Sequence, residues 1–201
     1  MQQEIEVKVK IKDEQLIQLK QWLSNNGKFE GTVVHYECYL DNPTVPLTFT
    51  SKEGYKDARF YLRVRKSPEK GDTICLKKFY YDKNTGKTTH CDEWEVEVNN
   101  GETALQLLNA LGFSDATVIQ KERSIYRVSS FEVVIDSVKD LGVFVEVELK
   151  EPVDDVQLGL KRIYDLLMQA GITSFRKQER GYVSMAWNPD YDFGEQMNLQ
   201  G

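Results

Sequence analysis

The chain has 201 residues and a mass of 23.3 kDa, a length that favours one domain able to bury a core without metal or disulfide support. Hydrophobic residues make up 40% and charged residues 29%, which excludes wholesale disorder. The net charge of -6, from 32 acidic and 26 basic residues, argues against a general nucleic-acid-binding protein, because such proteins carry a strongly basic face.

The amino-terminal residues and the cysteines predict where the protein works. The opening ten residues, MQQEIEVKVK, are too charged for a secretory signal peptide, and no apolar run approaches membrane-spanning length. Three cysteines, at positions 38, 75 and 91, form no CxxC pair and are expected to be reduced thiols. We therefore expect a cytoplasmic protein with no membrane or nucleic-acid partner, present as a monomer or a homodimer.

The first quarter of the chain predicts a strand, a helix, a second strand and a loop. Residues 5–11 alternate apolar and charged side chains, which is typical of a strand with one buried face. Residues 13–25 place leucines and a tryptophan at helical spacing, ahead of an Asn-Gly stop. Residues 29–40 favour a strand, and residues 41–56, with two prolines, a long loop.

The middle of the chain predicts three further strands and a second helix. Alternation of apolar and polar residues places the strands at 58–66, 72–80 and 88–98. The segment KNTG at 83–86 is a hairpin turn signal between the last two of them. Residues 102–111 form an amphipathic pattern that stops at a glycine, as in a helix.

The last part of the chain predicts three strands, at roughly 116–128, 131–137 and 143–150, and a third helix near 153–170. The apolar face predicted for that helix consists of Leu158, Ile163, Leu166 and Leu167. Residues 187–201 lack periodicity and are expected to be a loosely ordered tail after a single domain at 1–186. The order of elements predicts an antiparallel α+β protein of eight strands.

The polar faces of these strands carry charges of both signs rather than the Ser, Thr and Gln of a plain solvated face. The cations are Lys8, Arg63, Arg65, Lys77, Lys121 and Arg123. The anions are Glu4, Glu6, Glu93, Glu95, Glu97, Asp136, Glu146 and Glu148. If the helices cover the apolar faces, the charged faces meet on the concave side of a curled sheet. Closing this sheet into a barrel would also remove its edges.

A barrel lined by charges gains little stability, because each ion loses hydration. A ligand that needs both signs explains the pattern better. Arginine and lysine bind phosphate oxygens, and carboxylates bind phosphates only through a divalent cation such as Mg²⁺ or Mn²⁺. The pattern therefore favours metal-assisted phosphoryl or nucleotidyl transfer on a small-molecule triphosphate.

An ordered set of short motifs over residues 4–150 resembles one known superfamily. The motifs are Glu4-Ile5-Glu6-Val7-Lys8, LRVR with Arg63 and Arg65, ICLK ending in Lys77, EWEVEV with Glu93 and Glu95, KER with Lys121 and Arg123, and VIDSVKDLGVFVEVE with Asp136, Glu146 and Glu148. Together they resemble the CYTH superfamily, also called triphosphate tunnel metalloenzymes. The segment from Asp136 to Glu148 looks most like class IV adenylyl cyclases.

The resemblance implies an α+β fold: a closed eight-stranded antiparallel β barrel with amphipathic helices packed outside. This barrel is a tunnel that binds a triphosphate together with one or two Mg²⁺ or Mn²⁺ ions. The implied phosphate-binding residues are Lys8, Arg63, Arg65, Lys77, Lys121 and Arg123. The implied metal ligands are Glu4, Glu6, Glu95, Asp136, Glu146 and Glu148, with Glu93 assisting. The implied catalytic residues are Glu4, Glu6, Lys8 and Asp136. The sequence departs from the family pattern at Cys75, where relatives have Thr.

Three functions fit this set of residues. The first is an adenylyl cyclase that converts ATP to 3′,5′-cyclic AMP and pyrophosphate. The alternative is a triphosphatase that hydrolyses inorganic tripolyphosphate, thiamine triphosphate or a nucleoside triphosphate. A further alternative is a polyphosphate-binding module without turnover. The aromatic run from Phe79 to Tyr81 is interpreted as strand packing rather than a base-stacking surface.

Overall fold

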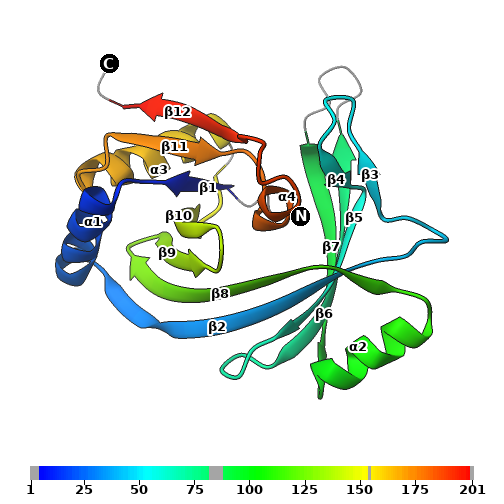
Figure 1. Ribbon diagram of the computed structural model, residues 1–201. Coiled ribbons are helices and arrows are strands. Elements are labelled where there is room, and N and C mark those ends of the chain that lie inside the picture. The colour runs from blue at the N-terminus through cyan, green and yellow to red at the C-terminus, as the bar shows by residue number, and fades with distance from the viewer. Residues whose placement is uncertain (1–4, 82–87, 154, 200–201) are drawn as a thin grey trace. The chain divides into compact units, whose positions relative to one another are not determined.

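The computed structural model describes residues 5–81, 88–153 and 155–199, so the predicted turn at 83–86 and Glu4 lie outside the described residues (Figure 1). The elements in chain order are β1 (Ile5–Lys10), α1 (Asp13–Asn26), β2 (Lys28–Asp41), β3 (Thr48–Thr50), β4 (Lys56–Ala58), β5 (Phe60–Lys66), β6 (Asp72–Tyr81), β7 (Thr88–Val98), α2 (Gly101–Ala110), β8 (Ser114–Val128), β9 (Phe131–Val138), β10 (Gly142–Leu149), α3 (Val156–Gln169), β11 (Ser174–Gln178), α4 (Tyr182–Trp187) and β12 (Gly194–Asn198). Within these described ranges, each helix is too short or too polar to cross a bilayer.

The α+β class and the antiparallel sheet are confirmed. Each of the eight predicted strands is found, as β1, β2 and β5 to β10, and the three predicted helices are α1, α2 and α3. The loop predicted at 41–56 contains β3 and the start of β4, which pair with each other as a separate two-stranded sheet.

The predicted closed eight-stranded barrel is wrong. The main sheet has ten strands in the hydrogen-bonded order β12-β11-β1-β10-β9-β8-β2-β5-β6-β7, with β12 and β7 at its two ends. The two additional strands come from the carboxy-terminal part of the chain. β11 pairs with β1 through Val9↔Lys177 and Lys10↔Arg176, and β12, within the segment expected to be loosely ordered, pairs with β11. Alternation shows which face of a strand is buried, but it does not show which edges pair.

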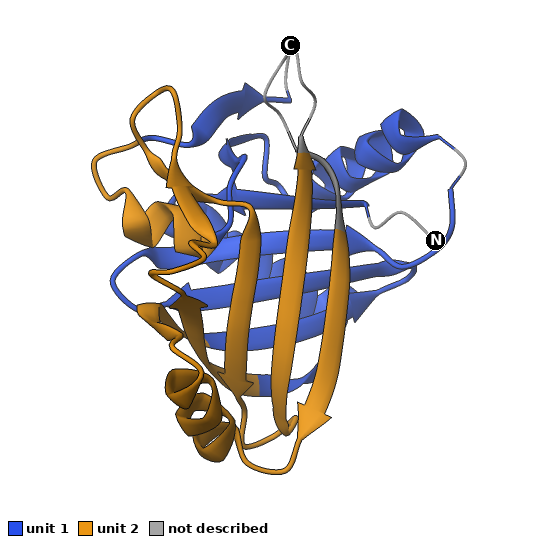
Figure 2. Cartoon of the chain, turned by 90° about the vertical axis from the view of Figure 1, so that its right-hand side faces the viewer, with its two compact units in different colours: residues 1–32, 122–181, 192–201 blue, residues 33–121, 182–191 orange. Residues whose placement is uncertain are grey.

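The chain forms two compact units, shown in different colours in Figure 2. Unit 1 comprises residues 1–32, 122–181 and 192–201, and unit 2 comprises residues 33–121 and 182–191. The strands β2 and β8 run from one unit into the other. The single domain expected at 1–186 stays a prediction.

The core of unit 1 lies between the apolar faces of β1, β9 and β10 and the helices α1 and α3. Val7, Val147 and Val133 are successive neighbours across the three strands and are buried. Leu23 of α1 and Ile163 of α3 belong to the same hydrophobic cluster. Burial of side chains of this size contributes about 1.5–3 kcal/mol each. This packing leaves the alternate residues of β1, β9 and β10 on the opposite face.

The core of unit 2 also lies between the apolar face of the sheet and a helix, here α2. Leu62 and Val64 of β5 pack with Leu40 of β2 and Leu105 of α2. The helix α2 begins where the side chain of its N-cap residue, Asn100, accepts a hydrogen bond of 2.8 Å from the backbone N–H of the third helical residue. The side chains that alternate with this core on β2, β5 and β6 face away from α2.

Helix α3 departs from the predicted apolar face at one position. Ile163, Leu166 and Leu167 are buried as predicted, but Leu158 is 52% exposed, so its place in the core was wrongly predicted. The residue that faces the sheet is Gly159, where an added Cβ would lie 2.6 Å from Cδ1 of Ile5. The close approach of α3 to β1 therefore depends on a glycine, and Leu158 lies one residue, about 100°, around the helix.

Because Ile163 is buried and Leu158 is exposed, the two residues should contribute differently to the free energy of unfolding. We expect Ile163→Ala to lower the free energy of unfolding by about 2–5 kcal/mol, because it leaves a cavity in a closed core. Leu158→Ala should change it by less than about 0.5 kcal/mol, as at other exposed sites. Urea unfolding followed by circular dichroism measures both, and equal losses would contradict the assigned face of α3.

Candidate functional site

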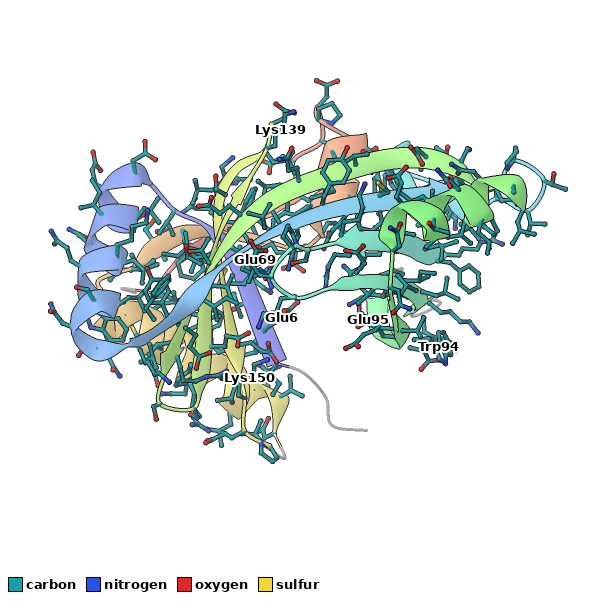
Figure 3. The ribbon with its side chains drawn as sticks, turned by 90° about the horizontal axis from the view of Figure 1, so that it is seen from below. Glu6, Glu69, Trp94, Glu95, Lys139 and Lys150 are labelled. Carbon is teal, nitrogen blue, oxygen red and sulfur yellow. The ribbon has the colours of Figure 1, made fainter. Side chains whose placement is uncertain are left out.

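In unit 2, the charged side chains predicted from the sequence share one sheet face. Registered antiparallel partners lie on the same side of a sheet, and the pairs Tyr39↔Arg63, Arg63↔Cys75 and Cys75↔Glu95 run across β2, β5, β6 and β7. Figure 3 shows Glu95 and Trp94 projecting from opposite sides of β7. The face that carries Arg63 is thus the one turned away from the Leu62 and Val64 core.

Glu37 lies at the centre of this face and was not predicted. One of its oxygens, Oε1, accepts a hydrogen bond of 2.9 Å from Nε of Arg65 and one of 3.5 Å from Nη1 of Arg63. The same oxygen lies 3.7 Å from Nζ of Lys121. The other oxygen, Oε2, accepts a hydrogen bond of 3.1 Å from the Tyr39 hydroxyl. Glu37 is 1% exposed, so three predicted phosphate-binding cations meet one buried carboxylate.

These contacts decide the charge states of the cluster. Burial alone would raise the pKa of Glu37, but the charges of Lys121, Arg63 and Arg65 outweigh it and lower that pKa to about 2. Burial and the neighbouring Glu37 charge raise the pKa of Tyr39 well above its usual range. The carboxylate is therefore ionised and the phenol neutral over the physiological pH range.

A second group of charges lies farther along the same face. Nζ of Lys77 lies 2.8 Å from Oε2 of Glu93, and Nη2 of Arg63 lies 3.4 Å from Oε2 of Glu95. The Cys75 thiol donates a hydrogen bond of 3.1 Å to Oε1 of Glu93. Burial raises the pKa of Cys75 to about 12, and the hydrogen bond to Glu93 adds to that effect although the Arg63 charge opposes it. The thiol is thus a neutral donor.

The side chains of Cys75, Glu93 and Glu95 offer ligand atoms within 4.8 Å of one another, as a metal site requires. The two carboxylates suit Mg²⁺ or Mn²⁺, which prefer hard oxygen ligands. A neutral thiol does not suit these ions. This group therefore fits a divalent cation through Glu93 and Glu95 alone.

Helix α4 packs on the charged face of unit 2 through aromatic and hydroxyl groups. Nζ of Lys121 lies 5.2 Å from the ring centre of Tyr182, and the hydroxyls of Tyr61 and Ser184 lie 2.8 Å apart. The Tyr61 ring also makes edge contacts with Phe79 at 4.9 Å and with Trp187 at 5.8 Å between ring centres. In this structure Phe79 packs against neighbouring rings, as the sequence suggested.

In unit 1, the charged residues predicted on β1 and β10 face each other in register. Glu6 pairs with Glu148, and Lys8 pairs with Glu146 at 3.0 Å between Nζ and Oε1. Glu6 is labelled on β1 in Figure 3. The next strand, β9, extends the first row, because Glu148 pairs with Glu132. Three carboxylates thus follow one line across three strands.

Arg123 organises the rest of the unit 1 face. Its Nε and Nη2 donate to the two oxygens of Asp136 at 2.8 and 2.6 Å, a bidentate pair. Nη2 also donates to Oε2 of Glu146 at 2.6 Å. Asp136 is fully buried, and Arg123 donates a hydrogen bond to each of its carboxylate oxygens. Arg123, Asp136, Glu146 and Lys8 form one network with two charges of each sign.

Three further residues of this face were not predicted. Lys150 lies 2.6 Å from Oε2 of Glu148 and 3.6 Å from Oε1 of Glu132, and Nη2 of Arg127 lies 3.0 Å from Oε2 of Glu132. Period-two alternation would have found Arg127, which shares the parity of Arg123, and Glu132, which shares that of Asp136. On β2 the alternation of charge is not clean, and it gave no such signal for Glu37.

The structure therefore brings the predicted residues together in two groups. Unit 2 holds Arg63, Arg65, Lys77, Lys121, Glu93 and Glu95, and unit 1 holds Glu6, Lys8, Arg123, Asp136, Glu146 and Glu148. Their individual roles stay predictions, and Glu4 lies outside the described residues.

The family model of the CYTH domain matches residues 2–182 of the chain. The chain belongs to the CYTH family. It is 25% identical over 183 residues to a Methanocaldococcus jannaschii protein provisionally named an adenylate cyclase, covering 90% of this chain and 97% of that protein. It is 30% identical over 93 residues to adenylate cyclase CyaB of Aeromonas hydrophila, covering 45% of this chain and 48% of the other.

Two solved structures resemble this fold. A Pyrococcus horikoshii protein, PH1012, is 26% identical with a TM-score of 0.66, covering 90% of this chain and 98% of its own. A Hippeastrum protein, whose description reports a dominant triphosphatase activity, is 15% identical with a TM-score of 0.68, covering 94% and 98% of the two chains. The second likeness concerns the fold alone.

The lowered pKa of Glu37 predicts a defined acid sensitivity. A carboxyl group whose pKa falls from 4.5 to about 2 on folding stabilises the folded chain fully above about pH 4.5, and this stabilisation is lost as the pH falls toward 2. Its size is on the order of 3 kcal/mol. The test is urea unfolding of wild type and Glu37→Gln between pH 6 and pH 2.5. The difference between their free energies of unfolding should become smaller as the pH falls. A difference that stays constant over this range would contradict the assignment.

Proposed function

We propose that the chain is a metal-dependent enzyme that acts on a triphosphate, and that its reaction is the conversion of ATP to 3′,5′-cyclic AMP and pyrophosphate. One observation carries the proposal. In each unit, arginine or lysine side chains and carboxylates gather on the sheet face opposite the apolar core, where apolar residues could stabilise the fold as well. The family match over residues 2–182 and the adenylate cyclase names of two relatives support it. The buried thiols of Cys38 and Cys75, neither in a disulfide, support a cytoplasmic location as part of the proposal.

The proposed phosphate-binding residues follow from the chemistry of their side chains. In unit 2 they are Arg63, Arg65, Lys77 and Lys121, and in unit 1 they are Lys8 and Arg123. Guanidinium groups bind phosphate oxygens through two parallel hydrogen bonds, and ammonium groups bind them as point charges. In the cyclase reaction the ribose 3′-oxygen displaces pyrophosphate from the α-phosphorus. Cations bound to the leaving pyrophosphate would stabilise the negative charge that it gains.

The proposed metal ligands are Glu6, Asp136, Glu146 and Glu148 in unit 1 and Glu95, assisted by Glu93, in unit 2. Carboxylate oxygens are the donors that Mg²⁺ and Mn²⁺ prefer, so these residues fit such an ion. A bound divalent cation supplies charge neutralisation at the phosphate and lowers the pKa of an attacking hydroxyl. Lys8 and Arg123, both bound to Glu146, orient its carboxylate.

Hydrolysis of a triphosphate is the second candidate, and one observation favours it. The rings of Tyr61, Phe79 and Trp187 are engaged with one another beside the charged face of unit 2. A cyclase needs a surface that binds the adenine, whereas a triphosphatase needs only the phosphate chain. Binding of polyphosphate without turnover remains the third alternative.

A product assay separates these functions. Purified protein is offered ATP and tripolyphosphate in parallel, with Mg²⁺ and separately with Mn²⁺, and the products are resolved by chromatography. Cyclic AMP with an equal amount of pyrophosphate supports the cyclase. Orthophosphate without cyclic AMP supports the triphosphatase. No product, with tripolyphosphate bound in calorimetry, would leave only the binding module.

The proposed metal ligand Glu6 gives a direct mutational test. We expect Glu6→Gln to lower kcat by at least about 100-fold, because the amide removes an anionic ligand while its shape is kept. The melting temperature should change little, since Glu6 is exposed. The matched control is Glu122→Gln, which removes one exposed carboxylate elsewhere in unit 1. Turnover that is unchanged in Glu6→Gln would contradict its role.

Arg65 tests the phosphate-binding face of unit 2. Arg65→Ala should raise KM for the triphosphate by about 10-fold or more, since a charge-assisted pair with phosphate is lost. The control is Lys66→Ala, the next residue of β5, whose Nζ binds Glu102 on the other face at 3.0 Å. A fall in melting temperature with KM unchanged would show a purely structural role for Arg65.

A further inference from the structure

Glu37 makes four contacts with side chains of unit 2, and none of the predicted roles uses it. Its carboxylate is almost completely buried, whereas the side chain of Arg65 keeps 20% of its surface exposed. A buried carboxylate can fix the position of partly exposed cations that it binds. We propose that Glu37 is a positioning residue that fixes Arg65 and Arg63 for binding of the triphosphate. This inference rests on the proposed function.

The atoms used by each contact carry the argument. Glu37 binds Arg65 at Nε, 2.9 Å away, which is the nitrogen nearest the backbone side of the guanidinium group. Of the terminal nitrogens of Arg65, Nη1 lies 3.9 Å from Oε2 of Glu95, a longer contact than the one at Nε. A guanidinium held at Nε has its plane fixed and its two terminal nitrogens left to bind a pair of phosphate oxygens.

The carboxylate is itself held in place. Oε2 accepts a hydrogen bond from the Tyr39 hydroxyl at 3.1 Å, so the carboxylate cannot turn without losing that bond. Nη1 of Arg63 lies 3.5 Å from both Oε1 of Glu37 and Oη of Tyr39. Tyr39 thus fixes Glu37, and the two together fix the arginines. Groups held in advance in this way lose less entropy when a ligand binds.

Stability alone does not account for Glu37. A buried ionic cluster often stabilises a fold no more than apolar residues of similar volume would, because every ion loses hydration. The core of unit 2 lies on the opposite face, around Leu62 and Val64. On the charged face, Glu37 fixes the positions of the Arg63 and Arg65 side chains.

Two roles for Glu37 predict opposite signs for one substitution. Glu37→Gln removes a negative charge beside three cations and keeps the size of the side chain. If Glu37 only neutralised the cations, tripolyphosphate would bind more tightly to the variant. If Glu37 positions them, tripolyphosphate should bind at least about 10-fold more weakly in spite of the gain in positive charge.

The experiment measures binding and the order of the arginine side chain separately. Calorimetry with metal-free tripolyphosphate gives Kd, and the ¹⁵N relaxation of the Arg65 Nε–H signal reports its order. We expect Glu37→Gln to raise the Kd for tripolyphosphate about 10-fold and to lower the order of the Arg65 Nε–H group. Tyr39→Phe should also raise Kd and lower the order of Arg65, to a smaller degree. This second variant keeps the inference testable if Glu37→Gln does not fold. Glu53→Gln, which removes an exposed carboxylate of unit 2, should do neither.

The outcomes separate this inference from the proposed function. Tighter binding in the variants, or an Arg65 signal as ordered as in wild type, overturns the positioning role. Wild-type protein that binds no tripolyphosphate overturns the proposed function. In that case the Arg65 relaxation still decides whether Glu37 orients the arginine, since the measurement needs no ligand.

Discussion

The pairing of a buried carboxylate with arginine is the interaction on which the charged face of each unit depends. A sheet with helices on one side must place its remaining side chains on the other, and here that set is mostly ionic. Like charges on neighbouring strands would repel each other. In each unit a buried carboxylate therefore binds an arginine: Glu37 binds Arg65 in unit 2, and Asp136 binds Arg123 in unit 1. The opposing carboxylates allow several cations to share one face without pushing the strands apart.

The two units solve this problem with different geometry. In unit 1, Arg123 is the centre, and it binds Asp136 and Glu146 with three short hydrogen bonds. In unit 2 the centre is the acid, and the arginines surround it. In the first arrangement Nε and Nη2 of Arg123 hold two carboxylates, whereas in the second Glu37 holds Arg65 at Nε. Under the proposed function, we expect unit 2 to bind the anion mainly through its arginines and unit 1 to offer more carboxylates to a cation.

Sequence reasoning predicted the strands and the helices because both have a short period that the apolar residues display. It predicted Arg63, Arg65 and Arg123 because their alternation and motifs coincide. It missed Glu37, since residues 29–40 show a β-rich composition without clean alternation of charge. It misplaced Leu158, because helical spacing alone tolerates an error of one residue. The closed barrel failed for a different reason: the partner of a sheet edge is a long-range choice, and short strands such as β11 have little periodic signal.

The tight set around Glu37 has a consequence for how this sequence can vary. Loss of Glu37 leaves Arg63, Arg65 and Lys121 side by side without the anion between them, whereas loss of one cation still leaves Glu37 two partners. The four positions therefore differ in how freely they can change. A cation of this cluster can be replaced at less cost than the carboxylate that the cations share.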